Sequence, residues 1–129
     1  MQHFRDVASL PPSGPWAGYY QYGHDGAKHR MKLDLTFAQS GAIEGEGIDE
    51  IAPFTINGFL ETATNQAYWT KSYIGMESVE YYGLYDGRSI CGNWTLRRFS
   101  GGFRIWPSAL ENEETVHRKI EEPSEVVLV

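Results

Sequence analysis

A bulky apolar residue followed two positions later by glycine recurs at least six times in this chain of 129 residues. A spacing of two places both residues on the same face of a β-strand. Glycine weakens a strand interior, so its repeated use there indicates sharp bends, bulges or close approach of two backbones. A small sheet curls and closes into a barrel by these devices. Six occurrences are Trp16-Ala17-Gly18, Ile43-Glu44-Gly45 (with Gly47 two residues further on), Ile56-Asn57-Gly58, Tyr73-Ile74-Gly75, Tyr81-Tyr82-Gly83 and Ile90-Cys91-Gly92.

Eight segments have a strand-like pattern, with turn signals and no helical periodicity between them. Asp86-Gly87 predicts a hairpin with a type I′ turn, and Ser100-Gly101-Gly102 predicts the last turn. Short strands with regular turns are typical of an antiparallel meander. We therefore predict an all-β fold, a single eight-stranded antiparallel meander β-barrel. The predicted strands are residues 16–22, 29–38, 42–48, 53–60, 66–74, 78–85, 88–98 and 102–106.

The alternation of apolar and polar residues along each predicted strand indicates which residues face the core. In the second predicted strand Met31, Leu33, Leu35 and Phe37 alternate with polar or small residues and are expected to face the core. A slip of one residue exchanges the two faces of a strand, and the fifth strand is ambiguous in this respect. The other expected inward sets are Trp16/Gly18/Tyr20, Ile43/Gly45/Gly47, Phe54/Ile56/Gly58, Val79/Tyr81/Gly83, Ile90/Gly92/Trp94/Leu96 and Phe103/Ile105.

The two ends of the chain differ in composition from the middle. Residues 1–14 are predicted to form an N-terminal arm, residues 15–107 the barrel and residues 108–129 an acidic C-terminal tail. Ser108 and Glu111 fit a capping box, which predicts a short helix to about residue 122. A flexible tail or a cap over one barrel end is the alternative. Residues 125–129 could instead add a strand to the sheet edge of a partner.

Charge and cysteine content exclude several classes of protein. The chain carries 17 acidic and 11 basic residues, a net charge of −6, without a basic stripe, which argues against nucleic acid and anionic membrane as partners. The single cysteine, Cys91, excludes an intramolecular disulfide. The chain has neither an apolar run of the roughly 18 residues that cross a bilayer nor an N-terminal signal pattern. We therefore expect a soluble, cytoplasmic protein.

The region from Trp16 to Trp106 resembles the calycin type of barrel, the superfamily of avidins, lipocalins and fatty-acid-binding proteins. It is most similar to the avidin-like branch, whose eight strands run up and down with short turns. This resemblance implies a small molecule held in the barrel mouth. Biotin is not implied, because the polar residues that contact it in avidin have no matches here. The motifs that carry the resemblance are Trp16-Ala17-Gly18, Gly41-Ala42-Ile43-Glu44-Gly45, Ile56-Asn57-Gly58 and Ile90-Cys91-Gly92-Asn93-Trp94.

No nucleophile, phosphate-binding or dinucleotide motif is present in the sequence, so candidate site residues come from polar groups that share the inward face. Lys71 must be paired or close to water if it points inward, because an isolated buried charge is costly. With Asp49 and two tyrosines it would bind a small anionic or carbonyl ligand between tryptophan walls. Alternatively, Lys71 reaches the rim or pairs structurally with a carboxylate. The predicted ligand-binding residues are Tyr20, Asp49, Trp69, Lys71, Tyr81 and Trp94.

Other reactive side chains give weaker signals. Cys91 is expected to face outward as an ordinary strand residue, and no cofactor is indicated. His24, Asp25 and His29 could meet near the first turn and bind a metal opportunistically, but solvated turn residues are the simpler interpretation.

Several aromatic residues fall on the outer face by parity. They are expected to be covered by the tail, or to form an interface with a second copy or a protein partner. These residues are Tyr19, Tyr68, Tyr82 and Trp106.

Three functions are compatible with these features. The first is a protein that binds a small molecule in the open end of the barrel. The second is a protein-interaction module with a filled barrel and an exposed aromatic wall. The third is a barrel isomerase, cyclase or lyase in which Lys71 or a tyrosine acts as acid or base. The inward aromatic residues favour a filled interior and the inward glycines favour a hollow one.

Overall fold

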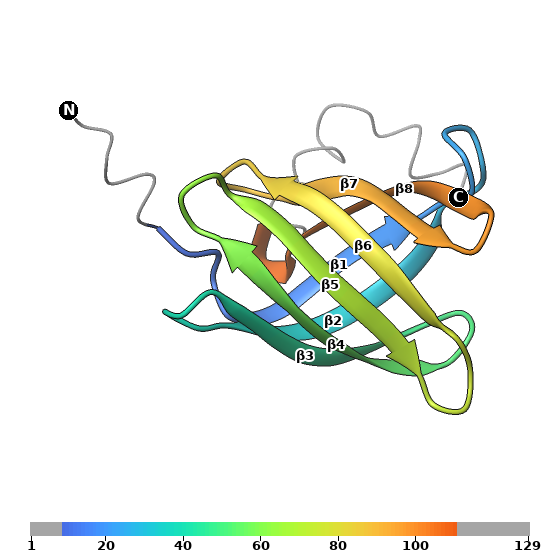
Figure 1. The fold of residues 1–129 in the computed structure, drawn as a ribbon, viewed down its shortest axis with the longest axis horizontal. Coiled ribbons are helices and arrows are strands. Elements are labelled where there is room, and N and C mark those ends of the chain that lie inside the picture. Colours follow the sequence, from blue (N-terminus) through green and yellow to red (C-terminus); the bar gives the residue numbers. More distant parts are fainter. Residues whose placement is uncertain (1–8, 111–129) are drawn as a thin grey trace.

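Eight antiparallel strands follow one another around a closed barrel in the order of the sequence (Figure 1). The structure is a computed structural model, and it describes residues 9–110. Strand β1 pairs with both β2 and β8, which closes the sheet without a free edge. The predicted all-β meander barrel is confirmed. The strands are β1 (Gly14–Tyr20), β2 (His29–Phe37), β3 (Ala42–Asp49), β4 (Pro53–Glu61), β5 (Gln66–Tyr73), β6 (Ser78–Tyr85), β7 (Ile90–Leu96) and β8 (Phe99–Pro107).

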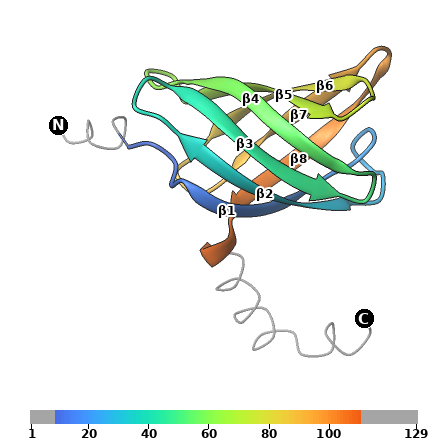
Figure 2. The same cartoon turned by 90° about the horizontal axis from the view of Figure 1, so that it is seen from below.

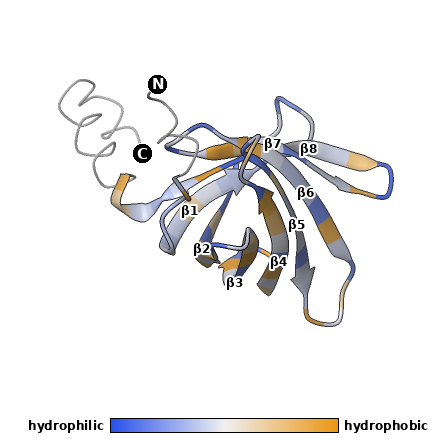
Figure 3. Cartoon of the chain, turned by 60° about the vertical axis from the view of Figure 1, so that its left-hand side comes forward, coloured by the Kyte–Doolittle hydropathy of each residue, from blue (hydrophilic) through white to orange (hydrophobic). Residues whose placement is uncertain are grey.

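The core lies inside the barrel and is built from alternate residues of each strand. In β2, Met31, Leu33, Leu35 and Phe37 are buried and the residues between them are exposed. Burial alternates in the same way along β6, where Figure 3 shows a hydrophobic band next to a hydrophilic one. The predicted inward faces are confirmed, and the ambiguous fifth strand turns Ala67, Trp69, Lys71 and Tyr73 inward.

The inward glycines allow the strands to pack tightly and do not leave space. A Cβ atom added at Gly58 would lie 2.5 Å from the Cβ of Trp69 on the neighbouring strand. One added at Gly47 would lie 2.6 Å from the ring of Phe54, which fills the space that a side chain would need. Gly75 differs from the others because it lies in the turn after β5, with a φ of 75°.

The last hairpin differs from the prediction. The expected turn at Ser100-Gly101-Gly102 is wrong, because these residues belong to β8 and the turn consists of residues 97–98. Arg97 has a φ of 57° there, and its guanidinium pairs with Glu77. Gly101 is needed for a close approach: it forms a bridge with Gly23, and a side chain at Gly101 would collide with the backbone of Gln21.

The Asp86-Gly87 hairpin is present, but its turn is not of type I′. The connection spans residues 86–89, and within it only Gly87 has a positive φ, of 98°. The Asp86 side chain accepts hydrogen bonds from the backbone N–H groups of Arg88 and Ser89, both at 2.9 Å. An aspartate that bonds the backbone two residues ahead stabilises a turn by itself.

One end of the barrel, here called the mouth, is formed by the four loops of residues 21–28, 50–52, 74–77 and 97–98. Figure 2 shows these loops together, at the opposite end from the start of β1. The four loops lie at one end because neighbouring strands run in opposite directions, so that every odd-numbered strand ends at the mouth. Strand ends and hairpin loops therefore bring residues distant in the sequence to one site.

Within residues 9–110, no helix is long and apolar enough to span a membrane. Residues 108–110 are helical, as predicted for the start of the C-terminal helix. The rest of that helix, the segment 125–129 and most of the N-terminal arm lie outside the described residues, as do His3 and His117.

Candidate functional site

A buried ion pair lies just inside the mouth. Nζ of Lys71 on β5 is 2.5 Å from Oδ2 of Asp49, the last residue of β3. The side chains of Lys71 and Asp49 are only 1% and 0% exposed. Strand β4 separates their two strands, so the pair forms across the inside of the barrel and not along the sheet.

The chain holds Asp49 as a carboxylate with hydrogen bonds to both oxygens. Tyr73 donates to Oδ2 at 2.6 Å, and the backbone N–H groups of Ile51 and Ala52 donate to Oδ1 at 2.8 and 3.2 Å. Burial alone would raise the pKa of Asp49, but the hydrogen bonds from Lys71 and Tyr73 outweigh burial, and the pKa is lowered. Asp49 is therefore charged at neutral pH.

Aromatic rings surround the ammonium group of Lys71. The ring centroids of Tyr20, Phe54, Tyr73 and Tyr81 lie 4.6, 4.5, 5.1 and 5.6 Å from Nζ, which is within cation–π range. We call these four rings the lysine cage. Its centre is poorly hydrated, so burial lowers the pKa of Lys71, and the hydrogen bond with Asp49 opposes this effect.

The tyrosines near the pair are neutral hydrogen-bond donors. Burial, and then the charge of Asp49, raises the pKa of Tyr20 to about 12. The pKa of Tyr81 is raised for the same two reasons. Nζ of Lys71 donates to the Tyr81 hydroxyl at 3.4 Å.

A cavity of about 60 Å³ lies above the pair, and we call it the mouth cavity. Tyr22 and Ile51 line it from the loops and are each 51% exposed, so the cavity opens to solvent between them. Its volume is that of about two water molecules. It is too small for a whole metabolite, and would take only a small group of one. The strand residues that line it are Tyr20, Lys71, Tyr73, Val79, Tyr81, Trp94 and Leu96.

Five of the six predicted site residues come together at the mouth. Tyr20, Lys71, Tyr81 and Trp94 line the cavity, and Asp49 binds Lys71. Trp69 does not line it, because it stacks on Tyr81 with centroids 5.5 Å apart and contacts Phe103, deeper in the core. Of the two alternatives for Lys71, the one in which it reaches the rim is wrong, since its side chain is buried, whereas the predicted pairing with a carboxylate is present.

Sequence reasoning missed four contributors to the site. Tyr73 shares the parity of Lys71, and this signal could have identified it. Phe54 and Met31 were recognised as core residues, but not as contacts of Nζ. Tyr22 is the last residue of the predicted strand 16–22 and shares the parity of Tyr20, but β1 ends at Tyr20 and Tyr22 lies in the loop that follows.

A row of aromatic residues crosses the outside of the barrel. Phe59 on β4 pairs with Tyr68 on β5, which pairs with Tyr82 on β6. Their exposures are 45, 45 and 41%, and the rings of Tyr68 and Tyr82 are 5.1 Å apart. Tyr19 and Trp106, also predicted to face outward, are half-buried against each other, with centroids 6.1 Å apart.

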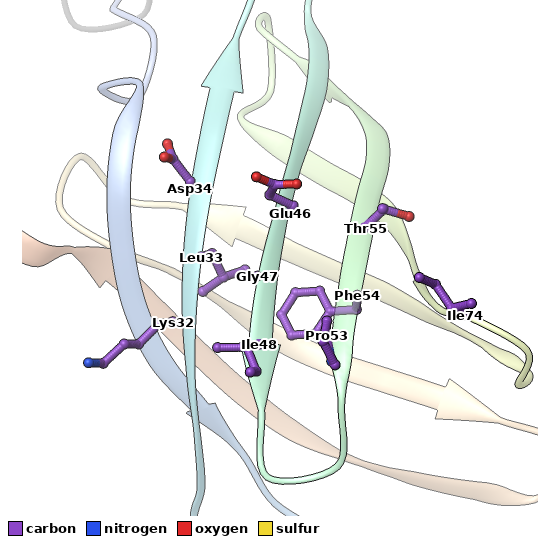
Figure 4. Close-up of a pocket in the computed structure, with 10 residues that line it drawn as sticks. All are labelled: Lys32, Leu33, Asp34, Glu46, Gly47, Ile48, Pro53, Phe54, Thr55 and Ile74. Carbon is purple, nitrogen blue, oxygen red and sulfur yellow. The ribbon is translucent and has the colours of Figure 1, made fainter.

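A groove of about 460 Å³ also marks the outer wall, over β2, β3 and β4. Figure 4 shows Asp34 and Glu46 near one end of it and Lys32 and Ile48 near the other. Its exposed side chains include both signs of charge, and the buried core residues Leu33 and Phe54 also line it. The groove and the Lys71 site lie on opposite sides of the wall and share Phe54, whose ring belongs to the lysine cage.

The remaining reactive side chains stand apart from one another. Cys91 is exposed on the outer face, as predicted. His29 Nδ1 lies 2.8 Å from Oε1 of Glu50, and stacks on Tyr20 with centroids 5.0 Å apart. Among the residues that the structure describes, no three histidine, cysteine or acidic side chains form a group that could hold a metal ion.

No protein-family model matches the chain, and no curated protein does. What it has in common with the calycin type is therefore the architecture, an eight-stranded antiparallel closed barrel. Function has to be argued from the site, because one barrel fold hosts many functions.

Proposed function

We propose that the barrel binds a small molecule at its mouth, as in the calycin type. The observation that carries this proposal is the buried Lys71–Asp49 pair beneath the mouth cavity. Removing two charges from water costs several kcal/mol per ion, and apolar residues of similar volume often stabilise a core as well or better. A buried pair at the bottom of an opening is thus better explained by ligand recognition than by stability.

The donors at the site define the ligand's polar end. Lys71 and the hydroxyls of Tyr20 and Tyr81 offer protons, so the matching group is an oxygen acceptor, a carboxylate or a carbonyl. The cavity accepts only that group and one or two further atoms.

The rim of the mouth suits an apolar remainder of the ligand. Its exposed apolar side chains would contact whatever extends out of the cavity, and exposed apolar groups around an opening are typical of binding sites. These rim residues are Tyr22, Ile51, Ile74, Met76 and Phe99.

Thermal stabilisation by a panel of short carboxylates and carbonyl compounds tests this proposal. A ligand at a hundred times its Kd stabilises the native state by about 2.7 kcal/mol. For a domain of this size the melting temperature should rise by roughly 10 °C or more. The double variant Lys71→Met/Asp49→Asn should lose the shift, whereas Tyr68→Ser on the outer wall should keep it. A panel without effect on the wild type, or an equal effect on the double variant, would contradict the proposal.

A protein-interaction module is the second candidate, supported by the exposed row of Phe59, Tyr68 and Tyr82. A row of aromatic side chains across three strands is a common basis of protein interfaces. Light scattering of the wild type and of Tyr68→Ser/Tyr82→Ser measures whether this face joins two copies. Loss of self-association in the variant would support the interface, and a wild type that stays monomeric at high concentration would exclude a second copy as the partner.

A further inference from the structure

We propose that Lys71 forms an imine with a small aldehyde that enters the mouth cavity, so that the ligand is held covalently. This inference rests on the proposed ligand site and specifies its chemistry. A lysine that is desolvated in an apolar pocket is a recognised nucleophile toward carbonyl carbons.

The surroundings of Nζ favour this reaction. Its neighbours are Asp49 at 2.5 Å, the Tyr81 hydroxyl at 3.4 Å and Sδ of Met31 at 3.7 Å, with the lysine cage around them. None of these groups competes for the carbonyl carbon, because the cage rings and the thioether are poor nucleophiles under these conditions. Asp49 can remove a proton from the ammonium, which creates the free amine that the attack requires.

The reaction balances without any other reagent. Asp49 takes one proton from Nζ, and the amine attacks the carbonyl carbon to form a C–N bond. A second proton moves from nitrogen to the former carbonyl oxygen, and the Tyr81 hydroxyl is close enough to relay it. Asp49 then returns its proton to this oxygen, the C–O bond breaks and water leaves. An ammonium and an aldehyde have become an iminium and water, and Asp49 is again a carboxylate.

The site is suited to the product as well as to the reactant. The iminium carries the same single charge as the ammonium, so Asp49 remains its counter-ion and the four rings of the cage remain its cation–π partners. Released water can leave toward the solvent between Tyr22 and Ile51, which line the cavity from the loops. Covalent binding therefore requires little rearrangement of charge.

The dimensions of the site indicate the class of aldehyde. The cavity accommodates a formyl group and one or two carbons, and the rest of the molecule must pass between the two exposed loop residues. An unbranched aliphatic aldehyde meets both requirements. A bulky group next to the carbonyl would collide with the walls formed by Tyr81 and Trp94.

Reductive trapping on the full chain tests the proposal. The wild type is incubated at pH 7 with hexanal and sodium cyanoborohydride, digested, and the alkylated lysines are located by mass spectrometry. Lys71 should react faster than the exposed Lys28 and Lys32, because burial lowers the pKa of its amine and so raises the fraction of free amine at pH 7. The preference should vanish in guanidinium chloride, which unfolds the cage. Alkylation confined to the exposed lysines would overturn the proposal.

Hexanoate separates this inference from the proposed function, because it presents the same acceptor and tail but cannot form an imine. The variant Lys71→Arg lacks a reactive amine, so hexanal and the reductant should leave position 71 unmodified. Stabilisation of the wild type by hexanoate without labelling of Lys71 would refute the imine alone. Neither stabilisation nor labelling would refute both. If Lys71→Arg does not fold, the wild-type peptide map still decides between these outcomes.

Discussion

Replacing Lys71 by methionine should destabilise the barrel far more than replacing Lys71 and Asp49 together. Lys71→Met leaves the carboxylate of Asp49 buried without its cation. The double variant Lys71→Met/Asp49→Asn removes both charges, and the side-chain carbonyl of the new asparagine would still accept the backbone hydrogen bonds from Ile51 and Ala52. The comparison therefore separates the cost of an unpaired charge from the value of the intact pair.

The expected magnitudes follow from the distance and the burial of the pair. At 2.5 Å and an effective dielectric constant of about 20, two unit charges attract by about 7 kcal/mol. Desolvation of several kcal/mol per ion offsets most of this attraction. The intact pair is thus nearly neutral for stability, whereas removal of one partner costs about 3–5 kcal/mol. We expect the double variant to be within about 1.5 kcal/mol of the wild type, the usual cost of a volume-conserving core substitution.

Urea unfolding at pH 7 measures these free energies, with the fluorescence of the buried Trp16, Trp69 and Trp94 as the signal. A double-mutant cycle with Asp49→Asn completes the comparison. The exposed pair of Arg97 and Glu77 is the matched control, and its cycle should show almost no coupling. If the effects of Lys71→Met and Asp49→Asn add to within about 0.5 kcal/mol, the two side chains do not interact and the reasoning fails.

Three further outcomes are expected. Tyr73→Phe removes a donor to a charged oxygen and should lower the free energy of unfolding by about 1.5–3 kcal/mol, and an unchanged urea midpoint would contradict the 2.6 Å hydrogen bond to Asp49. Gly58→Ala should cost about 1–3 kcal/mol by overpacking against Trp69, and a stabilised variant would contradict the close approach of β4 and β5. The pKa of Asp49 is lower in the folded than in the unfolded state, so its contribution to stability is complete above about pH 4 and is lost as the pH falls through the folded value. Melting temperatures measured from pH 2 to pH 6 should show this loss in the wild type and not in Lys71→Met/Asp49→Asn, and parallel curves would contradict it.

The local sequence pattern was sufficient to predict the strands and to predict which of their residues face inward. Alternation in β2 needs no information from elsewhere in the chain, because a strand with one buried face has only two choices of orientation. The same parity placed Asp49 and Tyr81 inside the barrel, but it left the face of Lys71 in the fifth strand open. Where a turn signal had no competitor, as at Asp86-Gly87, the hairpin was also predicted, although not its turn type.

Local pattern failed at the last hairpin, where two candidate turns lie side by side. Ser100-Gly101-Gly102 has the residues of a turn, and Arg97-Arg98 does not. Gly101 is nevertheless in β8, because the backbone of Gln21 approaches it too closely for a side chain. That contact joins segments about 80 residues apart, far outside the window in which turn signals are read.

By itself, then, the sequence determined that eight strands would close into a barrel and that an aspartate and several tyrosines would point inward, while it left the face of Lys71 open. Only the tertiary structure decided that Lys71 meets Asp49 across the intervening β4, and that Trp69 belongs to the core below them. It also decided that neighbours such as Phe54 fill the space beside the inward glycines. The space left at the mouth is about 60 Å³. The physical reason is that parity gives the side on which a residue lies, whereas the tilt and closure of the barrel determine which inward residues share a level.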